Sequence, residues 1–289
     1  MTALQKDALP TLVEILAQVL EIESYPRPKT RSGCGLLMLA LRSFARLRRT
    51  QDDNVWSRPL LKSLEMAEHQ ELRFPVKGAG EVSALLVNPK NAQWLLVLAH
   101  GAGAGMTHPF MEKLSEELVS VDIATFRYQF PYMEQRRRVP DSHAVLTATV
   151  EAAVQAATQA APGLPLLAGG KSMGGRMTSQ AAAQHPLEGV RGLVFFGFPL
   201  HPPNRPGTKR ADHLTKVTVP MLFLQGTRDT FADLKLLRPI CTKLRPRATL
   251  HIIESADHSF HVVKSSKRTD AEVLRELTET TASWAATLH

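Results

Sequence analysis

The chain has 289 residues, 44% of them hydrophobic, and a formal net charge of +8. This length allows one α/β domain with a full hydrophobic core, together with an appendage. Its two cysteines, Cys34 and Cys241, exclude a disulfide framework and favour a reducing compartment, so we expect a cytoplasmic protein.

Residues 1–65 differ in pattern from the rest of the chain. Residues 12–22 repeat apolar side chains at helical spacing, and an apolar run at residues 36–41 is followed by several arginines up to residue 49. The stretch 36–49 is typical of a basic amphipathic helix that contacts a membrane surface or a partner. The apolar run is far too short to span a bilayer, and the opening residues lack the pattern of a secretory signal.

We therefore interpret residues 1–65 as a basic helical extension and residues 66–289 as the main α/β domain. Two other interpretations of the extension stay open: an arm that binds a membrane or partner, and a helical flap packed near the active-site cleft. We expect the extension to be dispensable for folding.

Strand patterns alternate with helical patterns from residue 71 onward. Strands are predicted at residues 71–76, 81–88, 94–99, 123–128, 164–168, 190–196, 217–224 and 248–253, and helices at residues 110–119, 141–160, 176–184, 231–244 and 270–288. Residues 81–88 alternate as a half-exposed edge strand would, whereas residues 94–99 are apolar throughout, as in a strand buried on both faces. This alternation predicts a mostly parallel, doubly wound sheet with helices on both faces.

A GxSxG pentapeptide, residues 170–174, lies between a predicted strand and a predicted helix. At such a junction the small glycines allow a sharp turn that holds the Ser172 hydroxyl clear of the sheet in a strained conformation. Ser172 is therefore the candidate nucleophile. The alternative is a glycine-rich turn that carries a solvated serine.

A serine nucleophile needs a base, and the base needs an orienting acid. Asp229 follows the predicted strand 217–224, and His258 follows the strand 248–253, in the order Ser, Asp, His that suits a GxSxG turn. Asp229 could instead cap the helix that follows it. Asp257 is a rival acid and His261 a rival base.

A glycine-rich loop, His100 to Gly105, follows the apolar strand 94–99. Its backbone N–H groups are open to a ligand, and together with the N–H of Met173 they could stabilise an oxyanion. The sequence does not decide between Ala102 and Gly103 as the loop donor. A phosphate-binding loop is the alternative, but the GxGxxG spacing and the Walker lysine are missing.

These motifs together resemble a known group. The residues that carry the resemblance are HGAGAG from His100, FRYQFPYME at 126–134, GKSMGGRM from Gly170, GFPLHPPNRPG at 197–207, GTRD ending at Asp229 and ADHSF around His258. The chain resembles the dienelactone-hydrolase-like branch of the α/β-hydrolases, in particular the hydrolase-like family of testis-expressed protein 30 and NSL-complex subunit 3. The resemblance implies an α/β-hydrolase fold and a Ser172, Asp229, His258 triad, and it implies no substrate.

Residues 200–218 occupy the place where many α/β-hydrolases insert a lid. This segment is too short to fold alone, so we expect no large lid domain. We also expect a small substrate. His201 and Arg205 are predicted to line the substrate side of the site. A solvated loop is the alternative interpretation.

The sequence shows no recognised nucleic-acid motif, and its basic residues are dispersed apart from Arg136 to Arg138 and the N-terminal arginines. We therefore expect a small-molecule ester-like substrate and no nucleic-acid partner. The predicted function is a serine hydrolase that cleaves a small ester, thioester or lactone through an acyl-enzyme, with no cofactor and no metal. A non-catalytic α/β-hydrolase scaffold for protein binding and a serine peptidase or amidase are the alternatives.

Overall fold

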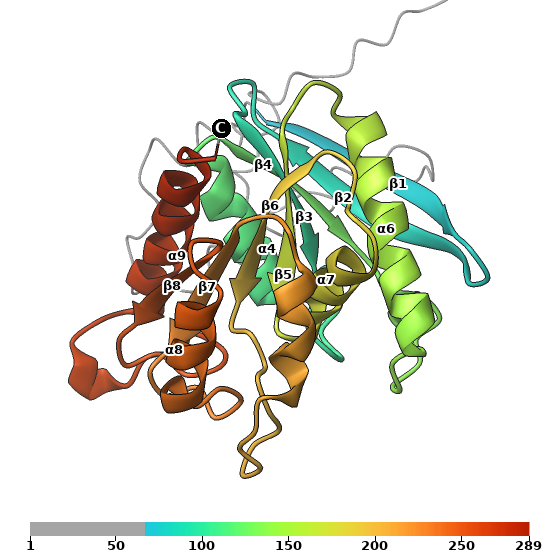
Figure 1. The fold of residues 1–289 in the computed structure, drawn as a ribbon. Helices are drawn as coiled ribbons and strands as arrows, with labels where there is room; N and C mark the ends of the chain where they lie inside the picture. The colour runs from blue at the N-terminus through green and yellow to red at the C-terminus, as the bar shows by residue number, and fades with distance from the viewer. Residues whose placement is uncertain (1–66, 289) are drawn as a thin grey trace, which may run out of the picture. The chain divides into compact units, whose positions relative to one another are not determined.

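The computed structural model describes residues 67–288, so the predictions for residues 1–65 lie outside the described part of the chain. Eight strands form one sheet in the order β1-β2-β4-β3-β5-β6-β7-β8 (Figure 1). The pairs β1–β2 and β2–β4 are antiparallel, and every other neighbouring pair is parallel. The predicted mostly parallel sheet is confirmed.

The central strands β3 to β7 are apolar and buried along most of their length, whereas β1 is mostly exposed and β2 and β8 are partly buried. The strands are β1 (Glu68–Val76), β2 (Gly80–Asn88), β3 (Trp94–Ala99), β4 (Ile123–Tyr128), β5 (Leu166–Lys171), β6 (Val190–Phe196), β7 (Met221–Gly226) and β8 (Ala248–Ile253). The prediction for residues 81–88 was wrong in one respect, because β2 pairs on both sides and β1 forms the edge.

Helices cover both faces of the sheet, as the alternating pattern predicted. They are α4 (Pro109–Val119), α5 (Pro131–Glu134), α6 (His143–Ala160), α7 (Met173–Gln184), α8 (Leu234–Lys243) and α9 (Asp270–Ala285), with the 3-10 helices η1 (Lys209–Lys216) and η2 (Lys264–Ser266). The apolar residues of α4 and α9 belong to one hydrophobic layer, and those of α6, α7 and α8 to the layer on the opposite face.

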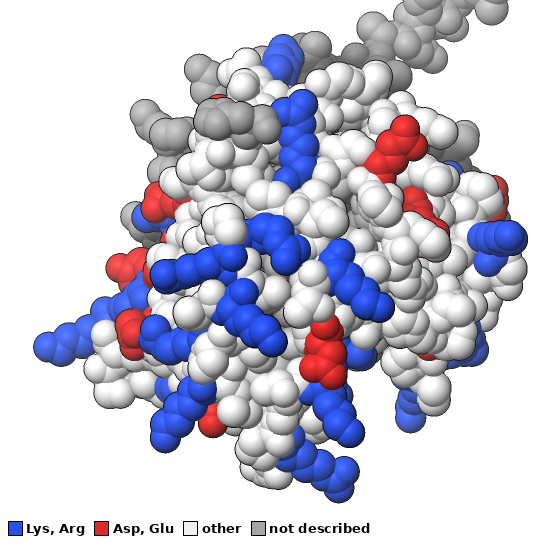
Figure 2. Space-filling view, viewed as in Figure 1, with Lys and Arg blue, Asp and Glu red and all other residues white. Residues whose placement is uncertain are grey.

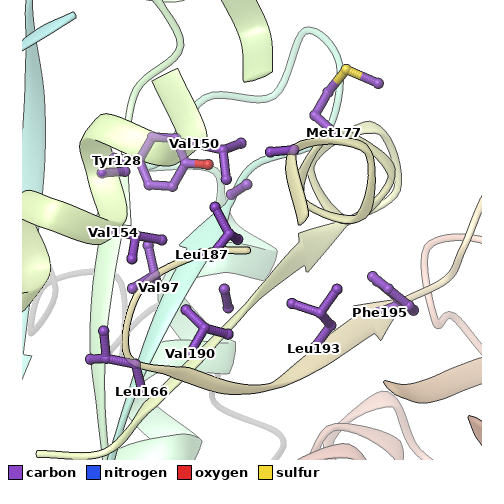
Figure 3. Packing of buried hydrophobic residues seen from close by; sticks show 14 of the residues in the cluster. Val97, Tyr128, Val150, Val154, Leu166, Met177, Leu187, Val190, Leu193 and Phe195 are labelled. Carbon is purple, nitrogen blue, oxygen red and sulfur yellow. The ribbon is translucent and has the colours of Figure 1, made fainter. Parts of the chain in front are cut away.

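The larger hydrophobic layer lies between the sheet and helices α6 and α7. This layer includes Val97 of β3, Val154 of α6, Met177 of α7 and Phe195 of β6, which Figure 3 labels. All four side chains are almost completely buried. Burial of a Val, Met or Phe side chain contributes about 1.5–3 kcal/mol, so this layer holds α7, and the turn before it, firmly against the sheet.

Several element boundaries differ from the predicted ones, for local reasons. Strand β7 begins at Met221 rather than at residue 217, because Val217 is buried outside the sheet, where it caps η1. Helix α8 begins at Leu234 rather than at residue 231, because the Asp233 side chain accepts a hydrogen bond from the Lys235 N–H and caps the helix there.

The segment 200–218 contains a single short element, η1, and no lid domain. Ala211 and Leu214 of η1 are buried, and Ser179 of α7 hydrogen-bonds His213 of η1 at 2.8 Å. The segment therefore packs onto the helix that follows the GxSxG turn.

Lys and Arg side chains gather on the face that carries α8 and η1 (Figure 2). Exposed basic residues of this region are Lys209, Lys216, Lys235, Arg238, Lys243 and Arg245. They are dispersed along the chain, and the fold brings them to one face. An anionic solute that approaches this face meets a positive field. Within residues 67–288, no helix is both long and apolar enough to cross a bilayer.

Candidate active site

Ser172 occupies a sharp turn between the end of β5 and the start of α7. Its backbone has φ 52° and ψ −116°, a conformation that costs energy for any residue other than glycine. The turn needs a glycine at position 174, where a Cβ atom would lie 2.5 Å from the Ala99 carbonyl oxygen. Without that Cβ, α7 approaches the end of β3 closely and the Ser172 side chain projects at the carboxyl edge of the sheet.

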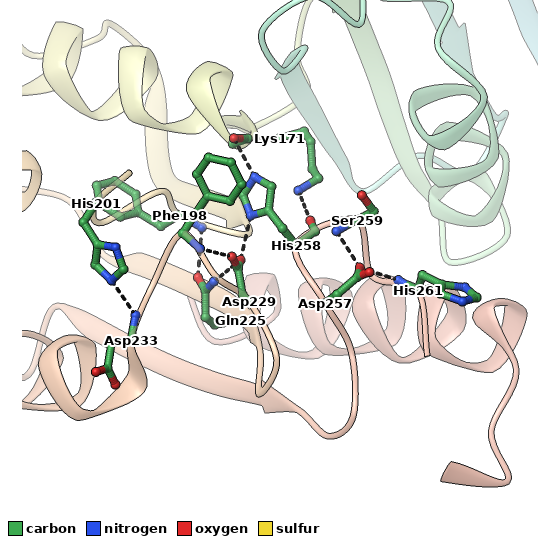
Figure 4. A network of polar contacts seen from close by, with 12 residues as sticks. Lys171, Phe198, His201, Gln225, Asp229, Asp233, Asp257, His258, Ser259 and His261 are labelled. Atoms are coloured by element: carbon green, nitrogen blue, oxygen red, sulfur yellow. Dashed lines mark hydrogen bonds and ion pairs between the residues drawn. The ribbon is translucent and has the colours of Figure 1, made fainter. Parts of the chain in front are cut away.

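The three residues predicted to form a triad lie in hydrogen-bond contact, and Figure 4 shows His258 beside Asp229. His258 Nε2 lies 2.8 Å from Ser172 Oγ, and His258 Nδ1 lies 2.7 Å from Asp229 Oδ2. An ionised carboxylate can only accept hydrogen bonds, so Nδ1 carries the proton and donates a hydrogen bond to Asp229. Nε2 is then unprotonated and accepts from the Ser172 hydroxyl.

Asp229 follows β7 and is held by two further donors. The Gln225 side-chain amide donates to Oδ2 at 2.5 Å, and the Phe231 N–H donates to Oδ1 at 2.7 Å. Gln225 is itself oriented, because its Oε1 accepts from the Phe198 N–H at 2.9 Å. These contacts fix a carboxylate that is 1% exposed in a position from which it faces the His258 ring.

Sequence reasoning missed Gln225. The available signal was its place as the one polar side chain at the end of the apolar strand Met221–Gly226, directly before the turn that carries Asp229. A buried amide in such a position needs a partner, and the nearby carboxylate supplies one.

His258 lies on the loop after β8, residues 254–261, called here the His258 loop. The Phe231 ring packs on the imidazole with a centroid distance of 4.3 Å and an interplanar angle of 30°. Ser255 and Phe260 in this loop both have φ 63°, so the loop keeps a strained path. Contacts from neighbouring segments must hold it there.

The rival acid and the rival base lie elsewhere. Asp257 Oδ1 accepts from the Ser259 N–H at 2.8 Å and the His261 N–H at 3.0 Å, and it thereby shapes the His258 loop (Figure 4). The His261 ring is exposed and contacts Asp270 at 2.8 Å. Neither side chain is hydrogen-bonded to Ser172 or to the His258 ring.

The two residues predicted to contact substrate differ from each other. His201 is buried, its Nδ1 contacts the Pro202 carbonyl at 2.9 Å, and its Nε2 accepts from the Asp233 N–H at 2.9 Å. Both ring nitrogens are thus engaged within the protein, and His201 ties the loop after β6 to the start of α8. Arg205 is exposed, and its role at the substrate stays a prediction.

The two candidate oxyanion donors in the loop after β3, Ala102 and Gly103, differ in whether their N–H group is already hydrogen-bonded. The Gly103 N–H donates to the Tyr132 hydroxyl at 3.0 Å. Within residues 67–288, the N–H groups of Ala102 and Met173 have no hydrogen-bond partner. Of the three predicted donors, Ala102 and Met173 therefore keep a free N–H group within this part of the chain, and Gly103 does not.

The buried side chain of His100 holds this loop in place. Its Nδ1 lies 2.7 Å from the Gly101 carbonyl, and its Nε2 accepts from the Phe130 N–H at 3.1 Å. Burial lowers the pKa of His100 to about 4, so the ring is neutral at physiological pH. A neutral ring with one donor and one acceptor suits these two contacts and acts as a structural brace for the loop.

Comparisons with known proteins agree with this architecture. A family model described as an alpha/beta hydrolase domain matches residues 92–286. A dienelactone hydrolase from Anabaena variabilis is 21% identical, with a TM-score of 0.61 over 76% of this chain and 97% of its own. An α/β serine hydrolase without a lid from Xanthomonas campestris is 18% identical, with a TM-score of 0.60 over 75% of this chain and 95% of its own.

A third structure, the esterase domain of a Rhodothermus marinus protein, is 15% identical, with a TM-score of 0.57 over 75% of this chain and 98% of its own. At these identities the structural likeness shows the fold, and the family model covers most of the described residues. The narrower resemblance to the testis-expressed protein 30 group stays a prediction. The chain has the α/β-hydrolase fold and belongs to the alpha/beta hydrolase domain family.

Proposed function

We propose that this chain is a serine hydrolase that cleaves a small ester, thioester or lactone through an acyl-enzyme. The observation that carries the proposal is the continuous chain of contacts from Ser172 Oγ to His258 Nε2 at 2.8 Å and from His258 Nδ1 to Asp229 at 2.7 Å. The strained backbone at Ser172 supports it, since strain of this kind persists where the surrounding structure maintains it for a function.

In the proposed reaction, Ser172 Oγ attacks the substrate carbonyl carbon while its proton passes to His258 Nε2. Asp229 holds the imidazole tautomer and stabilises the imidazolium. The N–H groups of Ala102 and Met173 donate to the carbonyl oxygen as it becomes negatively charged. The bond to the leaving group then breaks, and His258 returns the proton to the leaving oxygen or sulfur.

The acyl-enzyme is then hydrolysed by the same groups. Water attacks the acyl carbon, His258 accepts the proton of the water, and Ser172 leaves with that proton when the second tetrahedral intermediate collapses. No other group is needed to balance either half of the reaction.

Two observations support a small ester-like substrate. The segment 200–218 holds only η1, so this segment forms no lid domain that could enclose a long acyl chain. Structures with the same fold include proteins named as esterases and dienelactone hydrolases.

The test is a substrate panel at fixed enzyme concentration: p-nitrophenyl esters of increasing acyl length, an acyl thioester, a simple lactone and an amino-acid p-nitroanilide. We expect turnover of at least one ester, thioester or lactone, and background rates with Ser172→Ala. Turnover of the anilide alone would favour the peptidase or amidase alternative. Rates equal to those of Ser172→Ala across the panel would contradict the proposal.

A further inference from the structure

Lys171, which directly precedes Ser172, reaches into the His258 loop. Its ammonium group donates a hydrogen bond to the backbone carbonyl of His258, and Figure 4 shows the side chain lying beside that residue. The proposed nucleophile and the proposed base are therefore connected twice. One connection is the Ser172 hydroxyl to the imidazole, and the other is the neighbouring lysine to the backbone of the same histidine.

The ammonium group also lies near two aromatic rings. Lys171 Nζ lies 5.1 Å from the centroid of Phe260 and 5.8 Å from that of Phe110. The two rings are stacked, with centroids 5.8 Å apart and an interplanar angle of 14°. Distances below about 6 Å allow cation–π attraction. Phe110 is the second residue of α4 and Phe260 lies in the His258 loop, so Lys171 links three segments of the chain.

Gly197, the residue directly after β6, leaves space for this lysine. Gly197 has φ 72°, and a Cβ atom there would lie 3.0 Å from Lys171 Nζ and 3.5 Å from both Asp229 Oδ2 and His258 Nδ1. The lysine, the acid and the base thus meet at one side of a residue without a side chain. The charged groups that act on Lys171 are Asp229 and Asp257, and α4 contributes the Phe110 ring.

From these contacts we propose that Lys171 is a positioning residue that clamps the strained His258 loop, so that the imidazole stays aligned between Ser172 and Asp229. This inference rests on the proposed hydrolase function. Lys171 acts through the His258 backbone and contacts no reacting atom. Its positive charge strengthens the clamp, because a protonated amine binds the carbonyl and the ring faces better than a neutral one.

The charge of the clamp is sensitive to pH. Burial lowers the pKa of Lys171 to about 8, while the neighbouring carboxylates Asp229 and Asp257 act in the opposite direction. The lysine is therefore charged below about pH 8 and loses its charge as the pH rises through that value. An arginine in the same place would stay charged.

The test compares Lys171→Met, which removes the charge and the donor, with Lys171→Arg, which keeps both. Lys264→Met, the same change at an exposed lysine beyond the His258 loop, is the matched control. The measurements are kcat/KM for the best substrate against pH, the rate of Ser172 labelling by a fluorophosphonate, and hydrogen exchange of the peptide that covers residues 254–261.

We expect Lys171→Met to lower kcat/KM and the labelling rate by about 10²-fold, the scale of a misplaced catalytic group. Hydrogen exchange of residues 254–261 rises in this variant, and Lys264→Met matches the wild type. Wild-type activity falls as the pH rises through about 8. Lys171→Arg keeps activity within an order of magnitude and lacks that fall.

Wild-type labelling and wild-type loop exchange in a folded Lys171→Met would overturn the inference. If Lys171→Met does not fold, Lys171→Arg decides: the same decline near pH 8 as the wild type overturns the inference, and a decline moved to higher pH supports it. Failure of the proposed function is a separate result. In that case wild-type Ser172 is not labelled at any pH, and the reaction that Lys171 would serve is absent.

Discussion

Two histidine–carboxylate pairs in this chain have histidines only three residues apart and nearly equal hydrogen-bond lengths, but they differ strongly in solvent exposure. His258 and Asp229 are 2.7 Å apart, with side chains 19% and 1% exposed. His261 and Asp270 are 2.8 Å apart, with side chains 64% and 57% exposed. His258 of the first pair also contacts a serine on a strained turn, whereas Asp270 of the second pair accepts a further hydrogen bond from the Val262 N–H and both side chains are exposed. The surroundings of each pair, rather than its own geometry, separate a candidate base from a surface contact.

The physical reason is solvent screening. An exposed ion pair gains little free energy, because water competes for both partners. A carboxylate as deeply buried as Asp229 depends on its protein donors, here Gln225, Phe231 and His258. Such a group is held in one orientation, which a tautomer-fixing role requires. The following predictions test whether this difference carries over to function.

The largest effect is expected for Ser172→Ala and His258→Ala. Each variant should lower kcat by about 10⁶-fold relative to the wild type, since serine and histidine of a triad act as one unit. The double variant should be no worse than either single one. A double variant that is much slower than both singles would show that the two residues act independently.

Asp229→Asn should lower kcat by about 10⁴-fold, because an amide at this position can stabilise the wrong imidazole tautomer. The variant keeps the size of the side chain, and circular dichroism checks that the fold is kept. The corresponding change in the exposed pair, Asp270→Asn, is the control and should leave kcat within about twofold. Equal effects of the two changes would break the comparison.

A smaller loss is expected for Gln225→Leu, which removes one donor from Asp229 and the acceptor of the Phe198 N–H. We expect kcat/KM to fall by about 10-fold to 10²-fold through misplacement of the carboxylate. The melting temperature should also fall, because a buried N–H is left without a partner. Unchanged kinetics would show that Asp229 keeps its orientation without Gln225.

The smallest effect is expected for His261→Ala, with kcat/KM within about twofold of the wild type. Its hydrogen bond to Asp270 raises the pKa of His261. A raised folded-state pKa contributes stability below the unfolded-state value of about 6.5, and that contribution is lost as the pH rises through the folded-state value. The difference in melting temperature should therefore be larger near pH 5 than near pH 8.

The sequence predicts well the features that depend on neighbouring residues, and less well those that depend on contacts between distant parts of the chain. The predicted strands 94–99, 123–128, 190–196 and 248–253 match β3, β4, β6 and β8, because each is a short run of strand-forming residues bounded by turns or polar residues. Helix α7 begins at Met173 rather than at residue 176. Glycine has a low helix propensity, so local pattern alone does not place Gly174 and Gly175 in the helix, whereas close packing against Ala99 and Gly170 requires glycine there.

The candidate site divides in the same way. Ser172, Asp229 and His258 could be proposed because each follows a strand, and parallel strands bring those ends together. The sequence could not distinguish Ala102 from Gly103 as the candidate donor. The difference arises because the Gly103 N–H donates a hydrogen bond to the hydroxyl of Tyr132, which lies 29 residues further along the chain. Gln225 and the contact between Lys171 and His258 likewise depend on tertiary packing that no local pattern carries.

The most direct test of the central claim measures the rate of fluorophosphonate labelling in the wild type, His258→Ala and His261→Ala, with the modified residue identified by mass spectrometry. This reaction needs no knowledge of the substrate. We predict rapid labelling at Ser172 in the wild type and His261→Ala, and labelling slowed by at least about 10³-fold in His258→Ala. Folded wild-type protein that is not labelled at Ser172, or that loses labelling in His261→Ala and keeps it in His258→Ala, would contradict the account.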